Sequence, residues 1–64
     1  MNVTVNGQAQ SLAEPTTVRD LVASQPKRSM AVAVNGAVIP QSAHATTHLH
    51  EGDAIEIVTA VAGG

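Results

Sequence analysis

The stretch MAVAVNGAVIP, at residues 30–40, decides which fold the sequence forms. Residues 30–34 alternate large and small apolar side chains, as a strand inside a sheet does when one of its faces meets a helix. Asn35-Gly36 is the dipeptide best suited to the two positive φ angles of a two-residue hairpin turn. Residues 37–39 form a short returning strand that stops at Pro40, because proline lacks the N–H that a sheet needs. This stretch therefore predicts a β-hairpin.

A second hairpin is expected at the start of the chain. Residues 1–5, MNVTV, alternate apolar and polar side chains, and the dipeptide Asn6-Gly7 follows them. The return strand at residues 8–12 fits two registers. With a two-residue loop, Gln8 and Gln10 of the return strand lie on the same face as Val5 and Val3 of the first strand. With a one-residue bulge, Ala9 lies on that face instead. The sequence leaves that register open.

A short helix is expected to begin near Thr17. Thr17 and Asp20 have the spacing of a capping box, in which each side chain bonds to the other residue's backbone N–H. The apolar stripe that follows consists of Val18, Leu21 and Val22. Pro26 limits the helix to about two turns, and so short a helix is stable only when it is packed on a sheet.

The last strand is expected at residues 54–58, AIEIV, after a turn at residues 51–53, while residues 41–50 have the polar character of a loop. The order of hairpin, helix, strand, short strand and strand predicts an α+β domain, with a mixed sheet and one helix across it, in the β-grasp arrangement. The helix stripe is expected to cover six strand residues: Val3, Val5, Val32, Val34, Ile55 and Ile57.

Composition limits both size and function. The 64 residues suffice for one small domain, 1–64, and the sequence contains no Cys, Phe, Trp or Tyr, which excludes disulfides, thiolate catalysis and aromatic stacking on bases. A net charge of −2, with no basic cluster larger than Lys27-Arg28, argues against nucleic acid as a partner. The longest apolar run, residues 30–34, is too short for a membrane span. We expect no membrane partner and a cytoplasmic location.

Two polar clusters are interpreted as solvated surface. One consists of His44, His48 and His50, whose spacing suits Zn²⁺ or Ni²⁺, but the Ala-Thr-Thr run between them supplies no carboxylate to orient an imidazole. We therefore predict no metal site. The other consists of Glu51, Asp53 and Glu56, which we interpret as exposed polar positions. No set of nucleophile, base and orienting residue is found, so we expect no catalysis by the chain itself.

Five segments occur in a fixed order that spans essentially the whole chain. They are MNVTVNGQ at 1–8, TTVRDLV at 16–22, AVAVNGAVIP at 31–40, EGDAIEIV at 51–58 and VAGG at 61–64. Taken together, and closing on Gly-Gly, they resemble the ubiquitin-like sulfur carriers of the ThiS and MoaD family. The length of 64 residues favours the ThiS branch, since MoaD proteins are usually longer.

The resemblance implies a protein substrate rather than an enzyme. In this family an E1-like adenylyltransferase of the ThiF type uses ATP and Mg²⁺ to adenylate the terminal carboxyl group, which here is that of Gly64. Sulfur from a donor protein then replaces AMP, and the thiocarboxylate is presented to a thiazole synthase of the ThiG type for thiamine biosynthesis. Gly63 and Ala62 belong to an extended tail, residues 60–64, that gives access to Gly64, and the carrier binds no cofactor itself.

A mildly apolar patch leads to this tail, and partners are expected to dock there. It consists of Val58, Ala60 and Val61. Two alternatives remain open at this point: a MoaD-like carrier that serves molybdopterin or another sulfur acceptor, and a ubiquitin-like interaction module or tag. The acceptor pathway, the sulfur donor and the oligomeric state are not determined by the sequence.

Overall fold

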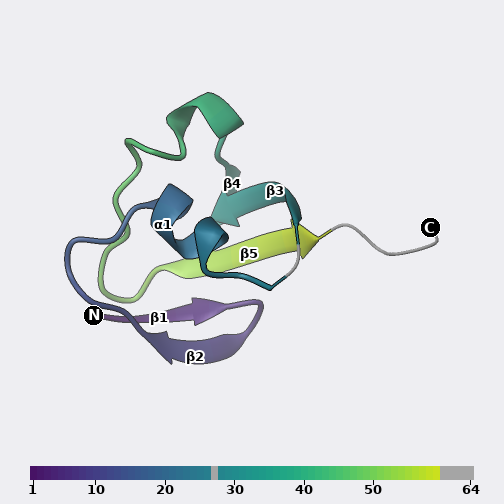
Figure 1. Cartoon of the computed structure of the whole chain (residues 1–64). Coiled ribbons are helices and arrows are strands. Elements are labelled where there is room, and N and C mark those ends of the chain that lie inside the picture. The colour runs from purple at the N-terminus through teal and green to yellow at the C-terminus, as the bar shows by residue number, and fades with distance from the viewer. Residues whose placement is uncertain (27, 60–64) are drawn as a thin grey trace.

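A mixed β-sheet with helix α1 across one of its faces makes up the described part of the chain (Figure 1). The computed structural model describes residues 1–26 and 28–59. Its elements are β1 (Asn2–Val5), β2 (Gln8–Ser11), α1 (Val18–Ala23), β3 (Ser29–Val34), β4 (Ala37–Val38), the 3-10 helix η1 (Gln41–Ala43) and β5 (Ala54–Thr59). Among the described residues the five strands are ordered β2-β1-β5-β3-β4. The predicted α+β, β-grasp arrangement is confirmed.

Strand β5 lies at the centre of the sheet. It is parallel to β1 and antiparallel to β3, whereas the pairs β1–β2 and β3–β4 are antiparallel hairpins. The strand β3, predicted from residues 30–34, is an interior strand as expected. The central position of β5 means that the last described element of the chain is paired along both of its edges.

Both hairpins turn at Asn-Gly, as predicted. The φ angles are 51° and 81° at Asn6 and Gly7, and 52° and 83° at Asn35 and Gly36. These are the two consecutive positive angles of a tight hairpin turn, which Asn tolerates and Gly adopts without strain. Two-residue loops follow from the pairing of Val5 with Gln8 in the first hairpin.

This pairing settles the register of the first hairpin. Val3 and Val5 are opposite Gln10 and Gln8, so the glutamines share the face of the two valines and no bulge brings Ala9 there. The glutamines remain exposed because β2 is an edge strand of the sheet.

The helix begins where the capping box predicts. Thr17 Oγ1 accepts a hydrogen bond from the backbone N–H of Asp20 at 3.2 Å, and the Thr17 N–H donates to Asp20 Oδ2 at 3.1 Å. The loop that includes Thr47 and Leu49 anchors this end of the helix, because the Val18 N–H donates to Thr47 O and the Leu49 N–H donates to Thr16 O, both at 2.9 Å.

Eight buried aliphatic residues form the core between α1 and the sheet: Val3, Val5, Val18, Leu21, Val32, Leu49, Ile55 and Ile57. Seven of them were predicted. Val22 and Val34, which were also expected, are only half-buried and pack against the edge of this core. Leu49 was missed because it lies in a polar run without periodicity, and the bridge between Thr17 and His48 brings it under the helix.

Candidate functional site

The residues to which the sequence assigns the chemistry follow directly after β5 in the sequence. Thr59 is opposite Ser29 of β3, and Val58 is opposite Ala31, with an irregularity in the register between these two pairs. The tail residues Ala60, Val61, Ala62, Gly63 and Gly64 lie outside the described residues. The roles assigned to them therefore stay predictions. The described part of the site is the end of β5 and the residues that surround it.

On its β1 side, β5 is held by a side-chain amide. β1 pairs with β5 only at Thr4–Ala54 and Val5–Ile55. After Val5, the Asn6 N–H donates to Ile55 O at 2.9 Å. The Asn6 carboxamide then bonds to Ile57 twice: its Oδ1 accepts from the Ile57 N–H at 2.8 Å and its Nδ2 donates to Ile57 O at 3.2 Å. A side chain thus takes the place of a further backbone partner and extends the parallel ladder.

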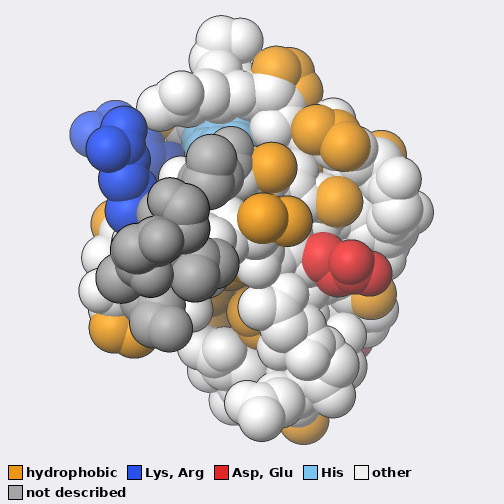
Figure 2. Space-filling view, turned by 90° about the vertical axis from the view of Figure 1, so that its right-hand side faces the viewer, with side chains coloured by type: hydrophobic (Ala, Val, Ile, Leu, Met, Phe, Trp, Pro, Cys, Tyr) orange, Lys and Arg blue, Asp and Glu red, His pale blue; other side chains and the backbone are white. Residues whose placement is uncertain are grey.

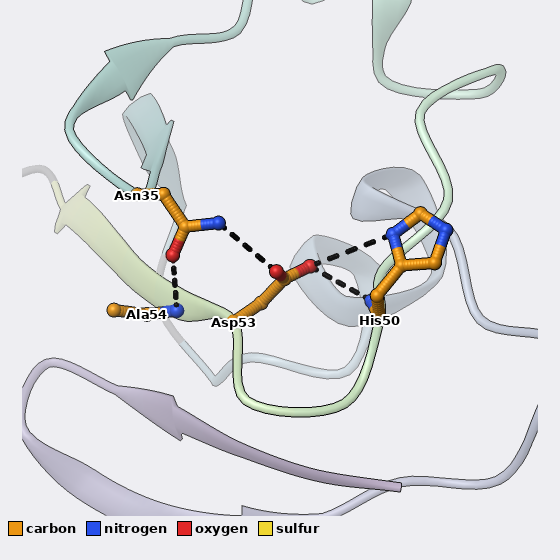
Figure 3. Close-up of polar contacts among 4 residues, drawn as sticks. All are labelled: Asn35, His50, Asp53 and Ala54. Atoms are coloured by element: carbon orange, nitrogen blue, oxygen red, sulfur yellow. Dashed lines mark hydrogen bonds and ion pairs between the residues drawn. The ribbon is translucent and has the colours of Figure 1, made fainter.

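A second carboxamide holds the other end of β5 (Figure 3). Asn35 Oδ1 accepts from the Ala54 N–H at 2.9 Å, and Asn35 Nδ2 donates to Asp53 Oδ1 at 3.0 Å. The other carboxylate oxygen of Asp53 accepts from the His50 N–H at 2.7 Å and lies 3.9 Å from His50 Nδ1. The Asn35–Asp53 contact therefore joins the β3–β4 turn to the residues just before β5.

The face of the sheet opposite α1 is apolar around Val58. Because side chains alternate, the buried pair Val32–Ile57 puts the neighbouring pair Ala31–Val58 on the uncovered face. Val58 is 58% exposed and Val38, on β4, is 73% exposed, and these are the exposed large hydrophobic residues of the described chain. Figure 2, which looks at the end of the molecule where β5 ends, shows several apolar side chains near one another with an acidic group beside them.

The patch differs in composition from the sequence prediction. Val58 is exposed as expected, whereas Ala60 and Val61 lie outside the described residues. Val38 was not foreseen. The signal for it was available, because the antiparallel pairing of β3 with β4 puts Val38 opposite Ala33, on the same face as Val58.

The three histidines each contact a different part of the chain. His44 Nε2 lies 3.1 Å from the Ile39 carbonyl oxygen, His48 is exposed in the bridge to Thr17, and His50 contacts Asp53. Among residues 1–26 and 28–59 no group of three metal-binding side chains is found. That the histidines form no functional metal site stays a prediction, to be tested by titration.

One interpretation of the acidic residues needs correction, that of Asp53 as an exposed position. Asp53, which lies outside the Ala-Thr-Thr run, stands beside an imidazole, since its Oδ2 lies 3.9 Å from His50 Nδ1. The side chain of Asp53 is also only 13% exposed, because it accepts hydrogen bonds from Asn35 and His50. Glu51 and Glu56 are exposed as predicted, although Glu51 Oε1 accepts from the Asn2 N–H at 2.8 Å.

The capping box shifts one carboxylate. The pKa of Asp20 is lowered, first by the hydrogen bond from the Thr17 backbone, then by that from the Thr17 hydroxyl, with a smaller contribution from the positive charge of Arg19. This group stabilises the start of α1, remote from the end of β5.

Comparisons with known proteins agree with this geometry. The family model described as the ThiS family matches residues 3–64. A crystal structure of the thiamine biosynthesis protein (ThiS) from Geobacter metallireducens is 32% identical, each chain is covered over its full length, and the TM-score is 0.80. A solution structure of a thiamine biosynthesis protein from the same organism is 33% identical, with 100% of this chain and 88% of that chain covered and a TM-score of 0.78. No curated protein gives a significant match.

No helix in the described part of the chain has the length and hydropathy of a membrane span.

Proposed function

This chain belongs to the ThiS family, and on that premise we propose that it is the sulfur carrier of thiamine biosynthesis, with Gly64 as the residue that carries the sulfur. The family match over residues 3–64 supports this proposal most strongly, because it includes both Gly63 and Gly64. Members of this family are small sulfur carriers and not catalysts.

The proposed chemistry takes place on a carboxyl carbon. A carboxylate resists nucleophiles because of its charge and resonance, so an E1-like enzyme of the ThiF type first joins it to AMP. A Gly64 oxygen attacks the α-phosphorus of ATP, pyrophosphate leaves, and the acyl-adenylate results. Sulfur at the oxidation level of sulfide then attacks the carbonyl carbon and AMP leaves, which yields the thiocarboxylate. A donor protein that holds this sulfur as a persulfide needs a thiol reductant to cleave the S–S bond and release it. A thiazole synthase of the ThiG type accepts this sulfur.

The residues of this chain have to present Gly64 and dock the partner. Gly63 and Ala62 have little or no side chain, so they suit a narrow channel in which a partner's phosphates approach the backbone. ATP and Mg²⁺ belong to the activating enzyme and the carrier itself needs no cofactor. We propose a cytoplasmic location for the protein together with these partners.

The partner surface we propose is the uncovered sheet face. Val58 lies two residues before the tail, and the exposed Val38 extends the patch across β3 to β4. Together with Ala60 and Val61 of the tail, these side chains give a partner apolar area next to the reacting end. Exposed apolar side chains in contiguous patches commonly mark such interaction surfaces.

The experiment that tests the proposal is ATP–pyrophosphate exchange with a ThiF-type enzyme. Deleting Gly64, or adding one residue after it, is expected to abolish exchange, and Gly63→Val to reduce it through the bulk of a β-branched side chain. The control variant Gln10→Ala, on the opposite edge strand, should exchange normally. Circular dichroism has to show the same fold for all variants. If the extended chain is activated without being trimmed, the proposal is wrong.

Intact mass separates the alternatives. After incubation with the activating enzyme, ATP and a sulfur source, exchange of one oxygen for sulfur on the chain supports a carrier, whereas a lysine-linked adduct supports a ubiquitin-like tag. Transfer of this sulfur to a thiazole synthase, and not to a molybdopterin synthase large subunit, distinguishes the ThiS role from a MoaD-like role.

A further inference from the structure

Both hairpin turns consist of Asn-Gly, a dipeptide with a reaction of its own. The backbone nitrogen of the glycine attacks Cγ of the asparagine, a C–N bond forms, and ammonia leaves, which gives a cyclic imide. Water then opens the imide to aspartate or isoaspartate. The net change is an amide plus water giving a carboxylate plus ammonia. Glycine favours the reaction because it has no side chain to hinder the attacking nitrogen.

The fold restrains the two asparagines differently. Each carboxamide must break its hydrogen bonds, to β5 or to the residue just before it, before the glycine nitrogen can reach its Cγ atom. The bonds of Asn6 go to the backbone of Ile57, two residues before the end of β5, and are partly buried. The bonds of Asn35 are exposed, and one of them goes to the side chain of Asp53 rather than to backbone. Water therefore competes more readily for the carboxamide of Asn35.

We propose that Asn35 is a site of spontaneous deamidation in the folded protein, which reacts before Asn6, and that the reaction detaches the β3–β4 turn from Asp53, the residue before β5. The contact at risk is the 3.0 Å hydrogen bond from Asn35 Nδ2 to Asp53 Oδ1. After deamidation an anionic oxygen takes the place of that donor, so two carboxylates face each other without a proton between them. Isoaspartate adds a backbone atom to a two-residue turn and disturbs it further. This proposal holds whether or not the chain carries sulfur.

Ageing the full-length chain tests the order of reaction. The protein is kept folded at mildly alkaline pH, samples are digested with trypsin, and deamidation is followed by mass spectrometry. Cleavage after Arg19 and Arg28 puts the two turns in different peptides. We expect the Asn35 peptide to gain mass first in the folded chain and both peptides to react at similar rates in denaturant. Equal rates in the folded chain, or no reaction at Asn35 while the denatured chain reacts, would overturn the proposal.

Paired variants test the consequence for the turn. Asn35→Asp mimics the product and is expected to lower the melting temperature at neutral pH. The double variant Asn35→Asp, Asp53→Asn exchanges the amide and the carboxylate: the amide introduced at position 53 donates to the new carboxylate, and its oxygen still accepts from the His50 N–H. Most of the lost melting temperature should return. If Asn35→Asp melts like the unmodified chain, or the double variant melts no higher than Asn35→Asp, the detachment step is wrong.

Discussion

Replacing Leu21 tests the packing of α1 on the sheet, on which the whole fold depends. Leu21 is 2% exposed and heads the fully buried side chains by volume. Truncation of a buried leucine to alanine costs about 2–5 kcal/mol, because the apolar contacts are lost and the cavity closes only in part. The structure puts Leu21 at the upper part of this range, since the helix is anchored at its start by backbone bonds to the loop and has little freedom to close the gap.

This loss is large for so small a protein. At about 0.05–0.15 kcal/mol per residue, a chain of 64 residues has a free energy of unfolding of roughly 3–10 kcal/mol. At the upper part of the range for truncating a buried leucine, about 4–5 kcal/mol, and with about 4–8 °C of melting temperature per kcal/mol in a domain of this size, we expect Leu21→Ala to lower the melting temperature by about 16–40 °C. Leu21→Asp adds an unpaired charge to the core, and we expect no folded population of that variant.

Far-ultraviolet circular dichroism is the assay for these variants, because the chain has no Trp, Tyr or Phe to report by fluorescence. Val58→Ala is the matched control: its side chain is 58% exposed, so its free energy of unfolding should stay within about 0.5 kcal/mol of the parent value. A Leu21→Asp chain that melts at the parent temperature would refute the burial of this helix face.

Three further predictions concern the cap, the histidines and the partner face. Thr17→Ala removes the capping hydroxyl and should lower the free energy of unfolding, measured in thermal melts, by about 1 kcal/mol. The folded-state pKa of Asp20 is lowered, so the stability that its carboxylate adds is present above its ordinary pKa and is lost as the pH falls through the lowered value. Asp20→Asn should therefore make the melting temperature at acid pH less dependent on pH. Zinc titration by calorimetry should show no stoichiometric binding in the micromolar range or tighter; such binding, abolished by His48→Ala, would establish a metal site. Val58→Asp should leave the melting temperature unchanged and slow activation by a ThiF-type enzyme, and normal activation would exclude Val58 from the partner interface.

The local features of the fold were predictable because their determinants are adjacent in the sequence. The Asn-Gly turns require only that two neighbouring residues accept positive φ angles, and the capping box requires only Thr17 and Asp20 three residues apart. Which side chains of β5 face the core was predictable from the alternation along the strand, with Ile55 and Ile57 buried and Glu56 exposed. The helix and the last strand were therefore correct to within a residue or two.

The features that were missed depend on tertiary contacts. Leu49 is buried only because the segment of residues 41–50 passes by the start of α1, where His48 bridges to Thr17. The sequence predicts Asp53 to be exposed because the turn around Gly52 is polar, and its low side-chain exposure arises from contacts with His50 and with Asn35, eighteen residues earlier. No periodicity or spacing within either segment carries this information.

The site was only partly predictable for the same reason. The sequence predicts a partner surface at Val58 and the residues that follow β5, and Val58 is exposed, but Val38 joins the patch only through the pairing of β3 with β4. The carboxamides of Asn6 and Asn35 were expected to matter for their turns alone. Their second role, as side-chain partners of β5, depends on how the two hairpins flank the central strand.

This second role bears on how a carrier of the proposed kind is handled. We expect a partner that draws residues 60–64 into its site to pull on β5 along the strand axis. The hydrogen bonds from β5 to its antiparallel neighbour β3 and its parallel neighbour β1 lie across that axis, so such a force is shared by many of them at once. The two bonds of Asn6 to Ile57 hold β5 close to its exit, and Asn35 holds the Ala54 N–H at its start. We therefore expect the central position of β5, with one asparagine near each end, to keep the eight-residue core folded while a partner engages residues 60–64 as proposed.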